Sequence, residues 1–356
     1  RGYFYRNNPC SSCFTKKSFW IVELRLMVPF TFLFIVLAAC VQTEDLQDSG
    51  SYTPEILGHY VRVEDGTKLP IKSWLPNGQI KAIILSLHGF NDYSSFFSVP
   101  GSILATDYGI ASYAYDQRGF GRTKNVGTWA GIKTYVGDAR SVIFAIKQRH
   151  PHTPIYLLGE SMGGAISILL MTSDDPPNLK GTILLAPAVW GDSAMPILQK
   201  FVLWVSAHTV PWLKVSGGGL GIKPSDNKEM LLALGRDPLV IKETRVDTIF
   251  GLVKLMDEAL KSSSRFLGPS LTLYGEKDEV IPIGPIIKMR ENLPRKEILR
   301  HGFAFYRNGY HMLSRDLQAP IVINDIASWI NRPTHPLPSK ADRRRLQMDL
   351  KRNGKL

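Results

Sequence analysis

One short segment constrains the fold of this chain more than any other: residues 157–166 read Leu-Leu-Gly-Glu-Ser-Met-Gly-Gly-Ala-Ile. Its G-x-S-x-G pattern is centred on Ser161. The apolar run Pro154–Gly159 precedes the serine, and the small and aliphatic run Met162–Thr172 follows it without a proline. These runs are typical of a buried strand and a buried helix. The segment therefore predicts a strand, a sharp turn at the serine and a helix, packed so closely that bulky neighbours would clash.

A serine held in such a turn is suited to nucleophilic catalysis. The turn lifts the hydroxyl clear of the backbone, and the start of the helix presents free N–H groups to a developing negative charge. This strand–serine–helix arrangement is typical of the nucleophile elbow of serine hydrolases. We therefore expect Ser161 to be a nucleophile, with an inert serine in a glycine-rich turn as the alternative.

The rest of the chain alternates strand-like and helix-like segments, which predicts an α/β fold with a mainly parallel sheet and helices on both faces. A chain of 356 residues, 44% of them hydrophobic, is long enough for a large core. We predict a helix over residues 130–150. We predict strands in His59–Trp74 (two strands joined by a turn at Asp65-Gly66), Lys81–Leu87, Ile110–Tyr115, Pro154–Gly159, Gly181–Pro187, Ser270–Gly275 and Phe303–Arg307.

The order of the remaining motifs is that in which an α/β-hydrolase presents its catalytic residues: serine, acid, histidine. Asp278 lies in the loop after a predicted strand and is our candidate for the acid, with Glu276 and Glu279 as nearby rivals. His311 follows the last predicted strand, in a loop able to reach back over the sheet, and is our candidate for the base. The other histidines after Asp278 are His301, which precedes that strand, and His335, which lies among prolines in the tail.

Hydrolysis through a serine also requires two backbone donors for the oxygen of the tetrahedral intermediate. We expect one to be the N–H of Met162, directly after the nucleophile. The second is expected in the loop after the strand Lys81–Leu87, where the N–H of Phe90 is the candidate. We expect His88 to have a structural role in holding this loop.

Seven motifs together resemble the monoacylglycerol lipase / lysophospholipase (serine aminopeptidase-like) branch of the α/β-hydrolases. They read HGFNDYS, DQRGFGRT, GESMGG, RDPLV, GLVKLMDEAL, YGEKDEVIP and GYHML, and the match runs from about His59 to Asn331. The segment Phe303–Asn308 departs from the pattern, because relatives often have a Pro- or Gly-rich turn before the base. The resemblance favours Asp278 as the acid. It implies a serine carboxylester hydrolase that acts on single-chain lipids, either lysophospholipid or monoacylglycerol, through an acyl-enzyme.

Two other functions stay open. A broad-specificity carboxylesterase would use the same residues, and a non-catalytic lipid-binding envelope lipoprotein would use none of them. We expect neither a cofactor nor a metal, because a serine triad requires none and no metal-ligand cluster is evident. The glycine-rich segment Ser216–Lys223 lacks the Gly-Lys-Ser/Thr ending of a phosphate loop. The region 41–356 contains no cysteine, which excludes a disulfide or a cysteine nucleophile there.

The predicted core, 57–189 and 269–331, is interrupted by a longer segment than one crossover helix requires. We interpret residues 190–268 as a helical cap. Residues Pro196–Val205 are strongly apolar, and Asp247–Leu260 has the pattern of an amphipathic helix with Asp247 as its N-cap. Apolar helices over an active site suit an acyl chain and contact with a membrane surface.

The N-terminal region 1–40 has the pattern of a targeting segment. Residues Leu26–Val41 form an apolar run of 16 residues with Arg25 before it, short for a membrane span and typical of a secretory signal. Leu37-Ala-Ala-Cys40 resembles the lipobox of bacterial lipoproteins, which predicts acylation of Cys40, a tether over 41–56 and attachment to the bacterial cell envelope. An uncleaved membrane anchor is the alternative, and a cytoplasmic location is less favoured. A start at Met27 would remove most of the positive segment.

The net charge of +12 is concentrated at the two ends of the chain. Residues 1–26 carry five basic side chains against one acidic, and residues 337–356 carry seven against two. The body in between therefore has an ordinary balance. We expect 332–356 to be a solvated, disordered tail, with contact to anionic lipid or nucleic acid as the less favoured alternative. For the protein as a whole we expect no nucleic acid partner.

Replacement of Cys40 by serine tests the lipoprotein interpretation. If Cys40 is acylated, Cys40→Ser is expected to release the protein from the membrane or to leave an unprocessed precursor. The activity of the solubilised protein stays unchanged, because Cys40 is remote in sequence from the three candidate catalytic residues. Mass spectrometry of the mature N-terminus is the measurement. An unmodified Cys40 inside a longer chain contradicts the lipoprotein and favours an uncleaved anchor.

Overall fold

The computed structural model of the chain describes residues 51–190, 195–219 and 221–344. Cys40, the apolar run before it and the end of the basic tail lie outside the described residues, so the predictions made for them are untested. Within the described ranges, no helix combines the length and apolar character that crossing a membrane requires.

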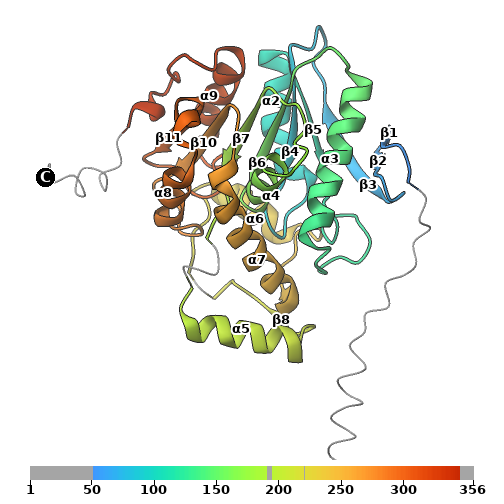
Figure 1. The fold of residues 1–356 in the computed structure, drawn as a ribbon, viewed down its shortest axis with the longest axis vertical. Helices are drawn as coiled ribbons and strands as arrows, with labels where there is room; N and C mark the ends of the chain where they lie inside the picture. The colour runs from blue at the N-terminus through green and yellow to red at the C-terminus, as the bar shows by residue number, and fades with distance from the viewer. Residues whose placement is uncertain (1–50, 191–194, 220, 345–356) are drawn as a thin grey trace, which may run out of the picture. The chain divides into compact units, whose positions relative to one another are not determined.

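The described residues form a nine-stranded sheet in the order β1-β2-β3-β5-β4-β6-β7-β10-β11 (Figure 1). The strands are β1 (Glu55–Leu57), β2 (Tyr60–Arg62), β3 (Lys68–Trp74), β4 (Ala82–Leu87), β5 (Ile110–Tyr115), β6 (Ile155–Glu160), β7 (Gly181–Leu185), β10 (Ser270–Gly275) and β11 (His301–Tyr306). The six strands from β5 to β11 are parallel, and β1, β2 and β3 extend the sheet in antiparallel pairing. The predicted mainly parallel sheet and the hairpin at Asp65-Gly66 are confirmed.

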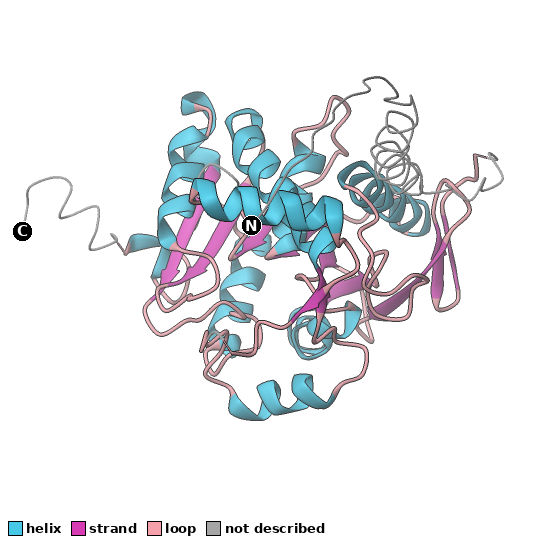
Figure 2. Cartoon of the chain, turned by 90° about the horizontal axis from the view of Figure 1, so that it is seen from below, coloured by secondary structure: helices cyan, strands magenta, loops and turns pink. Residues whose placement is uncertain are grey.

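Helices cover both faces of the sheet, as predicted, and Figure 2 shows them on both sides of the strands. One core lies beneath α2 (Ser98–Tyr108) and α9 (Ala319–Asn331). The other lies beneath α3 (Ile132–Arg149), α4 (Met162–Met171), α7 (Val246–Ser262) and α8 (Ile283–Asn292). Neighbouring residues of β4 point to opposite cores, Ile83 and Leu85 to one and Ile84 to the other. Burial on both faces explains why the central strands are apolar throughout.

Between β7 and β10 the chain forms α5 (Ile197–Thr209), β8 (Lys214–Val215), α6 (Lys228–Arg236) and β9 (Thr244–Arg245) before it enters α7. Figure 1 shows α5 far from the sheet, whereas α7 packs against α4 and shares its hydrophobic core. The apolar face of α7 is therefore explained by its packing on α4 and the sheet core. The outer limits of the predicted cap, 190–268, stay a prediction.

The prediction that Asp247 is the N-cap of this helix is wrong. Helix α7 begins at Val246, directly after β9, and its N-cap residue is Arg245. Asp247 lies in the first turn, where its carboxylate accepts hydrogen bonds from the side chain of Arg245 and from the N–H of Thr248. An acidic side chain in the first turn still stabilises the helix, because it faces the positive end of the helix dipole.

The expectation of a disordered tail from residue 332 is wrong for residues 332–344. Leu337 and Ala341 are buried in the core beneath α9. The backbone N–H of Ser339 donates to Asp325 Oδ1 at 3.0 Å, and its hydroxyl also donates to that carboxylate. The proline-rich composition gave no indication that Leu337 and Ala341 enter the core, or that the buried Asp325 binds the backbone of this segment. At the other end, the sheet begins at Glu55, inside the predicted tether.

Candidate active site

Ser161 occupies a strained turn between β6 and α4. Its backbone angles are φ 52° and ψ −112°, a positive φ that residues other than glycine rarely adopt. Four hydrogen bonds hold the turn. The N–H of Ser161 donates to the carbonyl of Leu185 at 3.0 Å, and its carbonyl accepts from the N–H groups of Gly164, Ala165 and Ala188. The surrounding structure thus fixes a conformation that costs about 1–3 kcal/mol by itself.

Glycine is required on both sides of this serine because backbone approaches it closely. A Cβ atom on Gly159 would lie 2.3 Å from the carbonyl oxygen of Gly163. A Cβ atom on Gly163 would lie 2.3 Å from the carbonyl oxygen of Leu87 in β4. These distances are far inside van der Waals contact, so the G-x-S-x-G spacing follows from the packing of α4 on β4 and β6.

Asp278 and His311 form a buried hydrogen-bonded pair. Asp278 Oδ2 lies 2.8 Å from His311 Nδ1, and the two side chains are 0% and 7% exposed. Asp278 Oδ1 accepts from the N–H groups of Val280 and Ile281 at 2.8 and 2.9 Å. These bonds orient the carboxylate toward the imidazole. The carboxylate in turn orients the imidazole. Because Nδ1 bonds to Asp278, Nε2 is the ring nitrogen that is available for proton transfer.

The rival acids and bases do not occupy this position. Glu276 and Glu279 are exposed, and Glu279 accepts a hydrogen bond from the backbone N–H of Lys223. His301 is the first residue of β11 and bonds to the hydroxyl of Ser270, at the opposite end of the sheet from His311. Among the candidates that the sequence left open, the structure therefore pairs Asp278 with His311.

Close backbone contact joins the loops of the acid and the base. A Cβ atom on Gly275 would lie 2.4 Å from the carbonyl oxygen of Gly309, and the N–H of Lys277 donates to that oxygen at 3.0 Å. The N–H of Tyr310 donates to Asp316 Oδ2 at 3.1 Å. Burial raises the pKa of Asp316 to about 6. The spacing between Asp278 and His311 is thus set by the backbone as well as by their own hydrogen bond.

The three candidate catalytic residues lie at one edge of the sheet. Ser161, Asp278 and His311 follow β6, β10 and β11, and parallel strands present their carboxyl ends at the same edge. Among the described residues, no hydrogen bond joins Ser161 to His311. Catalytic hydrogen bonds often form only when substrate is bound. The catalytic roles of these residues stay predictions.

The candidate oxyanion loop lies beside the serine. A Cβ atom on Gly89 would lie 3.4 Å from the Cβ of Ser161. In the part of the chain that the structure describes, the N–H groups of Phe90 and Met162 donate to no protein acceptor. Both groups therefore remain able to bind an oxygen of a substrate, although their predicted role is untested.

His88 holds this loop, as predicted. Its Nε2 accepts the N–H of Gln117 at 3.0 Å, and its Nδ1 contacts the carbonyl of Gly89 at 2.8 Å, which assigns the proton to Nδ1. Complete burial lowers the pKa of His88 and keeps the ring neutral. With both ring nitrogens occupied, His88 has a structural role.

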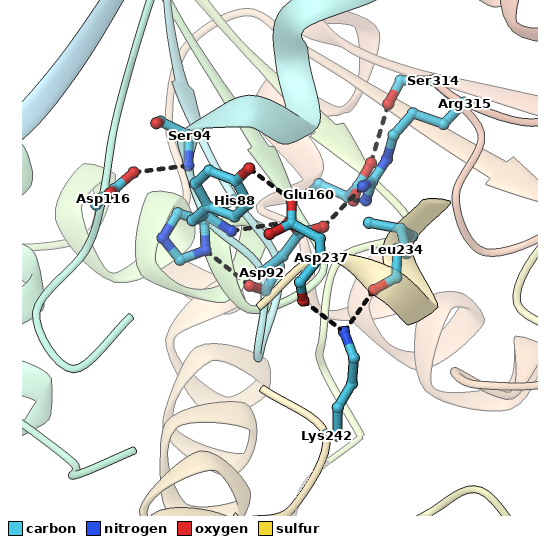
Figure 3. A network of polar contacts seen from close by, with 12 residues as sticks. His88, Asp92, Ser94, Asp116, Glu160, Leu234, Asp237, Lys242, Ser314 and Arg315 are labelled. Atoms are coloured by element: carbon cyan, nitrogen blue, oxygen red, sulfur yellow. Dashed lines mark hydrogen bonds and ion pairs between the residues drawn. The ribbon is translucent and has the colours of Figure 1, made fainter. Parts of the chain in front are cut away.

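The sequence interpretation missed a buried ionic network next to the site (Figure 3). The Arg315 guanidinium lies 2.7 Å from Asp92 Oδ2 and 2.5 Å from Glu160 Oε1, and the Ser314 hydroxyl donates to Glu160 Oε2 at 3.0 Å. Glu160, a charged residue at the end of a buried apolar strand, was the signal in the sequence for such a network, because a buried charge requires a partner. As for metals, the described residues contain no cluster of three or more His, Cys, Asp or Glu side chains able to hold an ion.

Comparison with known proteins agrees with this geometry. The sheet order, the helices on both faces and the strained serine turn define an α/β-hydrolase. Residues 78–318, more than half of the chain, match the hydrolase family described as "Serine aminopeptidase, S33", and the chain belongs to that family. The family confirms the resemblance that the seven motifs predicted.

Relatives and solved structures support the same assignment. The chain is 25% identical over 284 residues to monoglyceride lipase of Rattus norvegicus, covering 77% of this chain and 90% of the relative. It is 25% identical over 293 residues to caffeoylshikimate esterase of Arabidopsis thaliana, covering 77% and 85%. A crystal structure of a soluble variant of monoglyceride lipase from Saccharomyces cerevisiae, in complex with a substrate analog, has the same fold with a TM-score of 0.65. It is 18% identical and covers 82% of this chain and 99% of that chain.

Two glycine substitutions test the packing of the serine turn. Gly163→Ala is expected to lower the free energy of unfolding by about 1–3 kcal/mol, because its Cβ would overlap the backbone of β4. Gly137→Ala is the matched control, since Gly137 lies within α3 and its Cβ would meet no atom of the described ranges within 4 Å. That change is expected to raise stability by about 0.4–1 kcal/mol. Urea denaturation measures both, and equal effects of the two substitutions would contradict the close approach at Gly163.

Proposed function

We propose that this chain is a serine ester hydrolase that acts on monoacyl lipids, either lysophospholipid or monoacylglycerol. The observation that carries the proposal is the buried Asp278–His311 pair at the sheet edge where Ser161 occupies its strained turn. An acid that orients an imidazole, at the same sheet edge that presents a serine, has the arrangement that nucleophilic catalysis requires.

The proposed reaction proceeds through an acyl-enzyme. Ser161 Oγ attacks the carbonyl carbon of the ester while His311 Nε2 takes the hydroxyl proton. Asp278 stabilises the resulting imidazolium through Nδ1. The N–H groups of Phe90 and Met162 bind the oxygen that becomes negatively charged. His311 then protonates the departing alcohol, and water cleaves the acyl-enzyme by the same steps.

The substrate class is argued from the relatives and from the insertion between β7 and β10. The rat relative is named a monoglyceride lipase, and the yeast structure is a monoglyceride lipase with a substrate analog. None of the residues of α5 is buried. Large apolar side chains are exposed on α5 and on the segment after it: Ile197, Leu198, Phe201, Val202, Trp204, Trp212 and Leu213. An exposed apolar surface of this kind suits acyl chains and a lipid surface.

A broad-specificity carboxylesterase is the second candidate. The Arabidopsis relative, named a caffeoylshikimate esterase, has the same sequence identity to this chain, 25%, as the rat lipase, and it favours the carboxylesterase. A non-catalytic lipid-binding lipoprotein would not react with a fluorophosphonate probe, so labelling of Ser161 separates it from both enzymes. We further propose that an acylated Cys40 holds the enzyme at the bacterial envelope, close to lipid substrate.

Substitutions at the three candidate catalytic residues test the mechanism. Ser161→Ala is expected to abolish turnover and fluorophosphonate labelling with little change in stability, because the glycines that form the turn remain. Asp278→Asn is expected to lower kcat by about 10⁴-fold, because the imidazole loses its orienting acceptor. Glu276→Gln is the matched control on the same loop and should keep near-normal kcat. Near-normal kcat in Asp278→Asn with loss in Glu276→Gln would overturn the assignment of the acid.

Polar substitution on α5 tests the substrate class. Phe201→Ser or Trp204→Ser is expected to raise KM for a long-chain monoacyl ester more than for an acetate ester, because only the long chain reaches the apolar surface. Each lost contact is worth about 1.5–3 kcal/mol. Leu299→Ser is the control, since Leu299 is 98% exposed just before β11, at the opposite edge of the sheet. Equal changes in KM for both esters would argue against an acyl-binding surface on α5.

A further inference from the structure

Arg315 is a buried cation that binds two buried carboxylates from distant parts of the chain. Its Nη1 lies 2.7 Å from Asp92 Oδ2 and its Nη2 lies 2.5 Å from Glu160 Oε1. The three side chains are 7%, 8% and 3% exposed. The partners lie 223 and 155 residues before Arg315 in the sequence. One side chain therefore links three separate segments inside the protein.

Each of these segments carries one part of the proposed catalytic machinery. Asp92 lies two residues after Phe90, in the loop that offers the oxyanion N–H. Glu160 immediately precedes Ser161, and Arg315 lies four residues after His311. The guanidinium thus joins the base loop to the oxyanion loop and to the residue before the nucleophile. Figure 3 shows Arg315 with Asp92, Glu160 and Ser314.

Further hydrogen bonds make this linkage stiff within each segment. The N–H of Arg315 donates to the carbonyl of Met312 at 2.8 Å, which closes a turn directly after His311. Ser314 adds its hydroxyl bond to Glu160 Oε2 at 3.0 Å. On the other side, Asp92 Oδ1 accepts the N–H of Tyr93 at 2.8 Å. Displacement of Arg315 would therefore shift the backbone of the base loop and release Glu160 and Asp92.

Stability alone does not account for this network. Burying one cation with two anions carries a large desolvation cost, and well-packed apolar residues often replace buried ion pairs without loss of stability. The Nε of Arg315 is also buried, and it has no hydrogen-bond partner among the described residues. Burial alone would lower the pKa of Arg315, but Asp92 and Glu160 raise it above the ordinary value, so the guanidinium stays charged. What the network supplies is a fixed geometry, since a planar guanidinium offers its donors in fixed directions.

We propose that Arg315 is a positioning residue that sets the distances between Ser161, the Phe90 N–H and His311 through its bonds to Glu160 and Asp92. The inference rests on the proposed serine-hydrolase function. It predicts that loss of the two-sided bond changes the chemical step in correctly folded molecules, because small displacements of reacting groups lower rates steeply.

Two variants of Arg315 test this. Arg315→Lys keeps the positive charge but cannot reach both carboxylates with a rigid fork. Arg315→Met removes the charge and retains much of the apolar length. Arg118→Lys is the matched control, because Arg118 is also a largely buried arginine that binds two carboxylates. Those carboxylates, Asp65 and Asp138, lie in the β2–β3 turn and on α3, and neither segment carries one of the proposed catalytic residues.

The readout is kcat for a short p-nitrophenyl ester, divided by the number of active sites that fluorophosphonate labels when the reaction has gone to completion. Thermal unfolding is followed in parallel. For Arg315→Lys, per-site kcat is expected to fall at least about tenfold, and for Arg315→Met about 100-fold. KM is expected to change little, as for an interaction that acts on the transition state. Arg118→Lys should keep per-site kcat near the wild-type value.

A purely structural role predicts a different result. Fewer sites would be labelled and the unfolding temperature would fall, while per-site kcat stayed unchanged in Arg315→Lys. That outcome overturns the inference, and so does an equal fall of per-site kcat in Arg118→Lys. Absence of labelling at Ser161 in the wild-type protein would instead refute the proposed function itself, so the two failures are distinguishable.

Discussion

The strained backbone of Ser161 is the constraint on which the active edge of this molecule depends. The N–H of Ser161 donates to β7, and its carbonyl accepts three N–H groups from α4 and from the chain after β7. These bonds maintain the positive φ of this serine. The same turn requires Gly163 to touch the backbone of β4. Strands β4, β6 and β7 and helix α4 are therefore fixed relative to one another at this point. The same contacts position the loop that begins at His88, because this loop leaves β4 beside the serine.

Several polar groups at this edge are buried and bond to a neighbouring loop. His88 is neutral and bonds to both Gly89 and Gln117, whereas Asp116 accepts the N–H groups of Ser94 and Arg122. Such bonds are strong in a low-dielectric interior and costly to break, so they hold loops that have no regular structure of their own. The rigidity of the candidate site thus comes from polar contacts between loops, while the sheet below it is held by apolar packing.

The sequence predicted the parts of the structure that depend on local pattern. Strands such as β6 and β10 were evident because burial on both faces makes them continuously apolar. The choice of Asp278 over Glu276 needed the resemblance, because all three acids follow the same strand and only the contact with His311 separates them. The bond between Arg315 and Glu160 joins residues 155 positions apart, so no local sequence pattern could predict it. The prediction for residues 332–344 was wrong for a related reason, because Leu337 belongs to a core cluster that also contains residues far away in the sequence, such as Ile84.

Two helices of the insertion show why an apolar pattern alone does not specify what a helix contacts. Helix α7 packs closely on the body: a Cβ atom on Gly251 would lie 2.5 Å from the ring of Trp129, so the absence of a side chain admits that contact. Helix α5 is also apolar, yet Ile197 and Leu198 are 85% and 72% exposed. Exposed apolar area on this scale is unfavourable in water, and its free energy falls only when another apolar surface covers it. Under the proposed function, an acyl lipid and the lipid surface that carries it would supply that cover.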